Sequence, residues 1–143
     1  MGGEVEVTLE RVLVADDSRV FRSLVAEVLR ERRLEVLEAA NGREALERAL
    51  AARPDLLVLD ALMPLMSGFD VLARLREDAP EYRPAVFIVT AVYKSRRWES
   101  EARQHFQVQE YLEKPLEPNQ ILAAIDRHFP PAPAPPAEEV AER

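Results

Sequence analysis

Apolar residues occur along this chain in two patterns, short continuous runs and helical spacing, and these patterns predict its secondary structure. Five short apolar runs, bounded by polar or turn-forming residues, are typical of β-strands. They cover residues 11–15, 34–39, 55–60, 85–90 and 107–112. In the segments between and after these runs, apolar residues recur at helical spacing, as in Val20, Leu24 and Val28. We therefore expect a helix after each strand, and the fourth, over about residues 95–105, has the least regular pattern.

The alternation of five strands with five helices predicts an α/β fold with a parallel sheet covered on both faces. The runs 11–15, 55–60 and 85–90 are almost continuously apolar, as central strands must be. The runs 34–39 and 107–112 are interrupted by Glu and Gln, which edge strands tolerate. Three central strands and two edge strands fit the doubly wound, flavodoxin-like strand order 2-1-3-4-5. Sites in such sheets form beyond the carboxyl ends of the strands, where the order reverses.

Local signals mark where the helices and the domain begin and end. Asn41 and Ser67 each precede a glycine and a helical stripe, so both are expected N-caps, whereas the first helix has either Asp17 or Ser18 as its cap. Residues 1–8 are expected to be a lead-in and residues 9–129 the domain. Residues 130–143 are rich in proline and end in acidic residues, which predicts an extended tail or a linker.

Composition narrows the class of function. The formal net charge is −7, so the overall field does not favour binding to nucleic acid or to an acidic membrane surface. The sequence contains no cysteine, which excludes a disulfide framework, a thiolate zinc site and a cysteine nucleophile. No apolar run has the length of a membrane span, and the first residues lack a secretory apolar region. We therefore expect a cytoplasmic protein.

Polar side chains stand where the predicted strands end. Asp16 and Asp17 follow the first strand, Asp60 ends the third, Thr90 ends the fourth and Lys114 follows the fifth. Taken alone, each has an ordinary explanation, because an Asp before a helix is usually a cap or a turn residue. The predicted topology, however, would bring all of them to the same edge of the sheet. Their joint occurrence there favours a functional site.

Three carboxylates at one edge require compensating positive charge. At an effective dielectric of about 20, two carboxylates about 4 Å apart repel each other by roughly 4 kcal/mol. A divalent cation and the ammonium group of Lys114 would supply the compensation, and oxygen ligands with open positions favour Mg²⁺. A carboxylate there could act as a nucleophile toward a phosphoryl group and form an acyl phosphate, with the Thr90 hydroxyl as a hydrogen-bond donor.

These residues resemble the receiver domain of two-component response regulators. The resemblance is carried by "VLVADDS", "LLVLDALMPLMSGFDVL", "VFIVTA" and "EYLEKPL", and it covers about residues 10–129. It implies that Asp60 is the phosphoacceptor. It also implies that the carboxylates of Asp16, Asp17 and Asp60 hold Mg²⁺, with the backbone carbonyl of Leu62 as a further ligand.

The resemblance further implies a conformational switch. Lys114 would bind the phosphoryl oxygens and precede a cis peptide bond to Pro115. Thr90 would move toward phosphorylated Asp60, and Tyr111 would turn into the vacated space. This would change the partner affinity of the face made by the fourth helix, the fifth strand and the fifth helix. Dimerisation of two copies through that face is a further expectation.

The partners expected from the resemblance are proteins. A histidine kinase or a phosphotransfer protein would donate the phosphoryl group, and an unknown downstream protein would read the switched face. The expected docking residues for the donor are Val20, Phe21, Leu24, Pro115 and Leu116. Trp98, beside a basic cluster, either packs on the core or belongs to a partner surface.

The sequence departs from the family pattern at three positions. Leu62 and Val92 are apolar where some relatives carry polar groups that help water attack, so we expect slow autodephosphorylation. Gln107 replaces the usual glycine before the fifth strand, so that turn needs another backbone solution.

Three other functions compete with this interpretation. One is a protein of the same fold that signals by constitutive contacts, without phosphorylation. A second is an aspartyl-phosphate phosphatase of the dehalogenase type, but that class needs an Asp where Leu62 stands. A third is an FMN carrier of flavodoxin type, for which the acidic stretch "DDSRVFRS" is unfavourable. The expected protein is therefore not a conventional enzyme, apart from Mg²⁺-dependent self-phosphorylation from a phosphodonor and slow hydrolysis of its own acyl phosphate.

Overall fold

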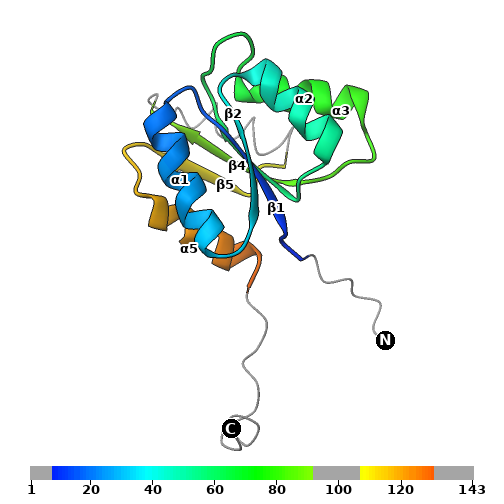
Figure 1. The fold of residues 1–143 in the computed structure, drawn as a ribbon. Coiled ribbons are helices and arrows are strands. Elements are labelled where there is room, and N and C mark those ends of the chain that lie inside the picture. Colours follow the sequence, from blue (N-terminus) through cyan, green and yellow to red (C-terminus); the bar gives the residue numbers. More distant parts are fainter. Residues whose placement is uncertain (1–7, 92–106, 131–143) are drawn as a thin grey trace, which may run out of the picture.

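The sheet has five parallel strands in the order β2-β1-β3-β4-β5, as the sequence predicts (Figure 1). The computed structural model describes residues 8–91 and 107–130. The strands are β1 (Arg11–Ala15), β2 (Glu35–Ala39), β3 (Leu56–Asp60), β4 (Ala85–Thr90) and β5 (Glu110–Glu113). The chain order reverses between β1 and β3, because β2 lies on the outer side of β1 and the later strands follow on the side of β3.

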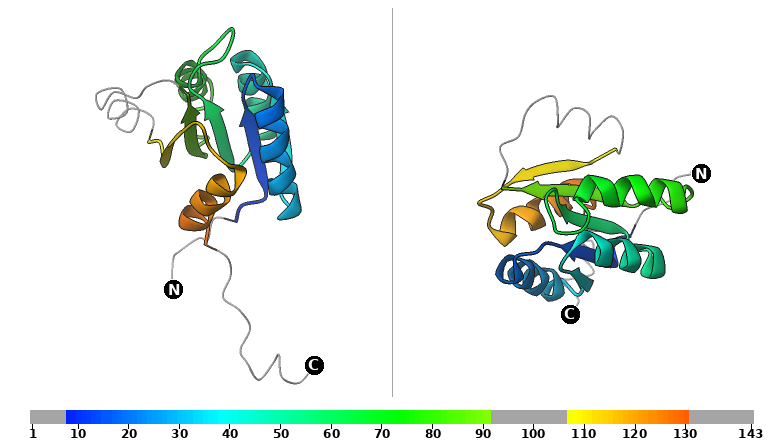
Figure 2. Two further views of the ribbon diagram at one scale, coloured as in Figure 1. Left: turned by 90° about the vertical axis from the view of Figure 1, so that its left-hand side faces the viewer. Right: turned by 90° about the horizontal axis from the view of Figure 1, so that it is seen from above.

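Four helices of the described residues cover the two faces of the sheet (Figure 2). They are α1 (Arg19–Glu31), α2 (Gly42–Ala52), α3 (Gly68–Asp78) and α5 (Pro118–His128). Alternate residues of each central strand point to opposite faces. Leu13 and Leu57 pack in a core with α2 and α3, whereas Val12 and Val58 pack in a second core with α1 and α5. The predicted fourth helix and Trp98 lie outside the described residues.

The predicted helix caps are present. Asn41 Oδ1 accepts a hydrogen bond from Glu44 N at 2.8 Å, and Ser67 Oγ accepts one from Asp70 N at 3.0 Å. For α1 the cap is Ser18 rather than Asp17, because Ser18 Oγ accepts from Phe21 N at 3.3 Å. The carboxylate of Asp17 is therefore not used as the cap of this helix.

Element ends differ from the prediction where the backbone leaves the regular conformation. The fifth strand begins at Glu110 rather than at residue 107, because Gln107 has a φ of 55° in the left-handed region, which a strand cannot include. This is the backbone solution that the missing glycine requires. The second and third strands begin at Glu35 and Leu56, one residue later than predicted. Phe129, at the expected end of the domain, is the C-cap of α5.

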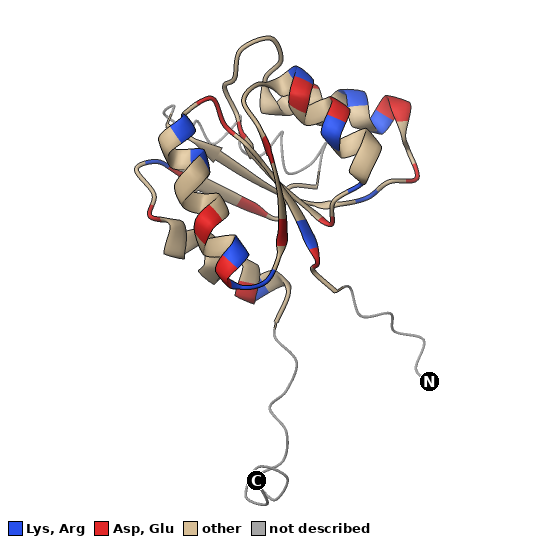
Figure 3. Ribbon diagram, viewed as in Figure 1, with Lys and Arg blue, Asp and Glu red and all other residues tan. Residues whose placement is uncertain are grey.

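The surface of the described helices carries charges of both signs. Acidic and basic residues are interspersed along α1, α2 and α3 (Figure 3). Among the described helices, none is long and apolar enough to cross a membrane.

Candidate functional site

The carboxyl ends of β1 and β3 place two aspartates side by side. In the parallel register, Val12 and Val14 of β1 pair with Leu56 and Val58 of β3, so the same alternation continues to Asp16 and Asp60. Both side chains are almost fully buried, with 1% of Asp16 and 6% of Asp60 exposed. The sheet therefore brings two carboxylates together at its edge, as the sequence predicts.

Lys114 joins these two carboxylates. Its Nζ lies 2.7 Å from Asp16 Oδ2 and 3.4 Å from Asp60 Oδ2. The backbone N–H of Lys114 donates to the carbonyl of Thr90 at 2.9 Å, which fixes the residue beside the end of β4. The ammonium also stands 4.4 Å from the centre of the Phe21 ring, at cation–π distance. The peptide bond from Lys114 to Pro115 is cis, as the resemblance implies.

Asp60 is held by the chain that follows it. Asp60 Oδ1 accepts a hydrogen bond from Leu62 N at 3.1 Å. Helix α3 begins directly against the end of β3, because Gly68 N donates to the carbonyl of Ala61 at 3.0 Å. A Cβ at Gly68 would lie 2.6 Å from the carbonyl oxygen of Asp60, so a side chain there would displace Asp60. The glycine is a requirement of this close approach.

Asp16 is fixed on several sides. Its N–H donates to the carbonyl of Ala39 on β2 at 3.0 Å. Its Oδ1 accepts a hydrogen bond from Ser18 N at 2.8 Å, while Oδ2 takes the ammonium of Lys114. The carboxylate is therefore satisfied in the structure despite its burial.

Burial and neighbouring charges shift the pKa values of Asp60 and Lys114. Burial raises the pKa of the Asp60 carboxyl, and the charge of Asp16 adds to the rise, against the lowering effects of the Leu62 N–H and Lys114. For Lys114, burial lowers the pKa of the ammonium, but its hydrogen bond and ion pair with Asp16, together with the charge of Asp60, outweigh this and raise it. Lys114 thus stays protonated and compensates the buried negative charge.

The residues fit a hard divalent cation. One carboxylate oxygen each from Asp16, Asp17 and Asp60 can be chosen so that all three lie within 4.8 Å of one another. Asp17 is exposed, unlike the other two, so the cluster opens to solvent on one side. Oxygen donors with room for water or a ligand oxygen match the coordination that Mg²⁺ prefers. The ligand role of the Leu62 carbonyl stays a prediction.

The expected switch residues lie on one side of the sheet. Ile88 of β4 is paired with Tyr111 of β5, and Thr90 lies two residues beyond Ile88, so all three share a face. Thr90 is fully buried, and Tyr111 is buried in the core beneath α2 and α3. The structure thus brings the pair together on one face, while their movement stays a prediction.

The expected docking residues divide between surface and core. Val20 and Leu24 of α1 are large apolar side chains exposed to solvent, and Pro115 is exposed as well. Phe21 and Leu116 are partly buried against the core formed with α1 and α5. The exposed apolar side chains of α1 therefore form a surface next to the acidic cluster.

Sequence reasoning missed two residues that support the site. The sequence predicts only a docking role for Phe21, yet its ring lies against the Lys114 ammonium. The sequence predicts no role for Arg22, whose guanidinium donates to the backbone carbonyl of Asp16 at 2.7 Å. An arginine on a helix gives no signal of this kind until the neighbouring strand is placed, so neither contact could be inferred from spacing alone.

Comparison with known proteins agrees with the fold and identifies the family. The model of the response regulator receiver domain matches residues 12–126. A crystal structure of the chemotaxis response regulator CheY4 of Vibrio cholerae is 32% identical, with a TM-score of 0.74, and the match covers 84% of this chain and 98% of that one. A CheY-like receiver domain protein from Methanospirillum hungatei JF-1, at 24% identity and a TM-score of 0.75, covers 85% of this chain and 94% of that one and supports the fold alone.

The curated relatives are longer proteins. A protein-glutamate methylesterase/protein-glutamine glutaminase of Geobacillus kaustophilus is 49% identical over 72 residues, which are 49% of this chain and 21% of that protein. The corresponding protein of Vibrio parahaemolyticus is 44% identical over 72 residues, which are 49% of this chain and 20% of that protein. The match thus spans about a fifth of the length of these relatives.

Proposed function

The chain belongs to the family of response regulator receiver domains, and on this premise we propose that it accepts a phosphoryl group on Asp60 and thereby changes its affinity for a protein partner. The observation that carries this proposal is the cluster of Asp16, Asp17 and Asp60 with Lys114 bound to two of the three carboxylates. Residues 9–129 would form the receiver unit and residues 130–143 its tail or linker. A cytoplasmic location is part of the proposal.

The chemistry follows from what the chain's own residues hold in place. A carboxylate oxygen of Asp60 would attack phosphorus in line with the donor, and the bond to the donor would break with its electron pair leaving on the donor. The N–H of Leu62 fixes the rotation of the Asp60 carboxylate for this attack. Mg²⁺ held by the three aspartates would neutralise charge on the phosphoryl oxygens. Lys114, whose Nζ lies 3.4 Å from Asp60 Oδ2, would supply a second positive charge.

The donor we propose is a histidine kinase or a phosphotransfer protein, which would dock against Val20, Phe21 and Leu24 of α1 and the loop at Pro115 and Leu116. The exposure of Val20 and Leu24 beside the acidic cluster supports this location. The output would be a downstream protein, or a second copy of the chain, that binds the face including β5 and α5. By this proposal the chain is a switch and not a conventional enzyme.

A beryllofluoride titration tests the switch separately from the chemistry. With Mg²⁺ present, we expect the amide signals of Thr90 and Tyr111 to shift in NMR spectra of the wild-type chain, because a phosphoryl mimic on Asp60 would draw in the Thr90 hydroxyl. The Asp60→Asn variant, which lacks the carboxylate, would show no such shifts.

A second candidate is an interaction module of the same fold that works without phosphorylation. Signals of Thr90 and Tyr111 that stay unchanged in the wild-type chain would favour it, provided that the same spectra show a folded domain.

A further inference from the structure

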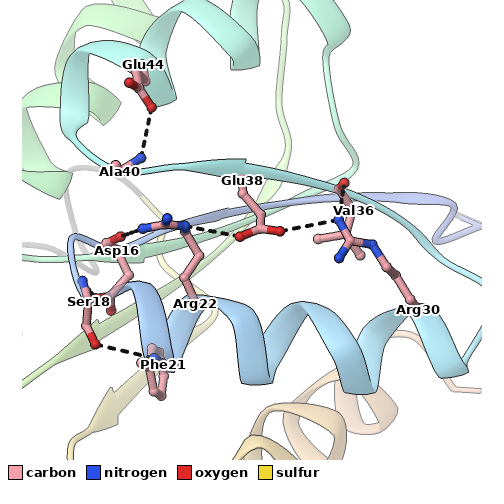
Figure 4. Close-up of polar contacts among 9 residues, drawn as sticks. All are labelled: Asp16, Ser18, Phe21, Arg22, Arg30, Val36, Glu38, Ala40 and Glu44. Carbon is pink, nitrogen blue, oxygen red and sulfur yellow. Dashed lines mark hydrogen bonds and ion pairs between the residues drawn. The ribbon is translucent and has the colours of Figure 1, made fainter.

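Arg22 links α1 to both β1 and β2 next to the acidic cluster. Its Nη1 donates to the carbonyl oxygen of Asp16 at 2.7 Å, and its Nε pairs with Glu38 Oε1 at 3.1 Å (Figure 4). The side chain is only 15% exposed, although arginine is usually a surface residue. A planar guanidinium can make two such bonds in different directions at once, which a lysine cannot reproduce.

The bond from Arg22 falls on the peptide group that joins two of the expected metal ligands. The carbonyl of Asp16 belongs to the peptide between Asp16 and Asp17. The amide of Asp16 is fixed by Ala39, and its carboxylate by Ser18 and Lys114. The bond from Ser18 closes a turn that spans this peptide and Asp17. Arg22 adds a hydrogen bond to the carbonyl of the same peptide, directly before the exposed Asp17.

Glu38 holds the guanidinium in place. It stands on β2 beside Val14 of β1, so its carboxylate reaches the side of the sheet that α1 covers. Its second oxygen, Oε2, pairs with Nη2 of Arg30 at 3.4 Å, and the same Nη2 lies 3.3 Å from the carbonyl of Val36. Glu38 therefore balances two arginines, but only one of them touches Asp16.

We propose that Arg22, oriented by Glu38, is a positioning residue that sets the Asp16–Asp17 peptide for binding of the divalent cation. The inference rests on the proposed Mg²⁺ site. It assigns Arg22 no contact with the cation. The arginine acts through the peptide group, in the way that outer-shell partners orient metal ligands.

The proposal and simple electrostatics predict opposite results for the loss of this arginine. Arg22 brings a positive charge close to the acidic cluster and repels another cation there. Charge alone therefore predicts that the removal of Arg22 would strengthen the binding of Mg²⁺. A positioning role predicts weaker binding, because Asp17 would lose its fixed direction. A merely structural role predicts a lower stability of the fold with unchanged affinity for Mg²⁺.

The test is a titration of the full chain with MgCl₂, for the wild type and for Arg22→Met. The NMR amide shifts of residues 16–18 report the binding. We expect the Kd of Arg22→Met for Mg²⁺ to rise about tenfold. Arg30→Met is the matched control, since it removes the same charge and the other partner of Glu38 without touching Asp16, and its Kd should equal that of the wild type. Thermal unfolding in EDTA measures any loss of stability separately.

Arg22→Lys keeps the charge and guards against a variant that does not fold. We expect its Kd to rise by a smaller factor, because an ammonium cannot span Asp16 and Glu38 in the same geometry. Tighter or unchanged binding in the Arg22 variants, or equal weakening in Arg30→Met, would overturn the proposal. A wild-type chain that fails to bind Mg²⁺ would instead contradict the proposed function itself.

Discussion

At the level of single residues, the site depends on the unequal contacts that the Lys114 ammonium makes with two carboxylates. The ammonium is closer to Asp16, at 2.7 Å, than to Asp60, at 3.4 Å. Both carboxylates are expected to bind the metal ion, but the stronger hydrogen bond belongs to Asp16 and the weaker one to Asp60, the expected nucleophile. This arrangement leaves an oxygen of Asp60 that phosphorylation can use without first breaking a short ion pair.

Gly68 carries a sharp steric requirement next to Asp60. Its replacement by alanine would bring a Cβ to 2.6 Å from the carbonyl of Asp60, so either α3 or the end of β3 must move. We expect Gly68→Ala to lower the free energy of unfolding by about 1–3 kcal/mol, measured by urea denaturation. Ser23→Ala, at an exposed position of α1, is the control and should change it by less than about 0.5 kcal/mol. Equal stability of Gly68→Ala and the wild type would contradict the close packing.

Leu62 places an apolar side chain, half exposed, two residues after Asp60, the proposed phosphoacceptor. It offers no hydrogen bond to a water that attacks the acyl phosphate. We expect the phosphorylated wild-type protein to persist for minutes or longer and phosphorylated Leu62→Asn to hydrolyse faster. The measurement is the rate at which each purified phosphoprotein loses its phosphoryl group. Decay of the wild-type phosphoprotein within seconds would refute this expectation.

At the level of elements, β5 is joined to the helix that follows it by an ion-pair cluster. Glu110 at the start of β5 pairs with Arg127 at 3.0 Å and with His128 at 2.8 Å, both at the end of α5. The hydrogen bond from Arg127 lowers the pKa of Glu110 below its ordinary value, and His128 adds to the effect.

This pairing predicts a pH dependence with a defined sign. A carboxyl whose pKa is lowered by folding stabilises the protein above its unfolded pKa of 4.5, and the contribution is lost as pH falls through the lower folded value. We therefore expect Glu110→Gln to be less stable than the wild type at pH 7, by less than about 1 kcal/mol. Thermal unfolding at a series of pH values should show the difference vanish in acid. A difference that stays constant across that series would mean that the charge of Glu110 contributes nothing.

The elements also show how far sequence patterns reach. The apolar runs predicted the five strands and their order, because central and edge strands differ in how continuously apolar they are. Boundaries were less certain, as at β5, where a left-handed Gln107 delays the strand. The acidic cluster and Lys114 were predictable because parallel strands end at one edge. The contacts of Arg22 and Phe21 were not, because they depend on how α1 lies against its neighbours.

At the level of the whole molecule, the two cores and the site occupy different parts of one fold. Buried apolar residues fill both faces of the sheet, while the charged cluster sits at one edge, where the strand order reverses. Within the described residues, the buried polar side chains are Asp16, Asp60 and Thr90, and all three belong to that edge. Buried charge is costly unless it is paired, so its concentration at one place indicates function rather than stability.

The most direct test of the central claim is phosphoryl transfer to Asp60. The full chain would be incubated with acetyl phosphate, with Mg²⁺ or with EDTA, and its intact mass measured. We predict one added phosphoryl group on the wild type and on the control Asp126→Asn, a partly exposed aspartate of α5, only when Mg²⁺ is present. Asp60→Asn should gain none. Phosphorylation of Asp60→Asn to the wild-type level, or no phosphorylation of the folded wild type, would contradict the account.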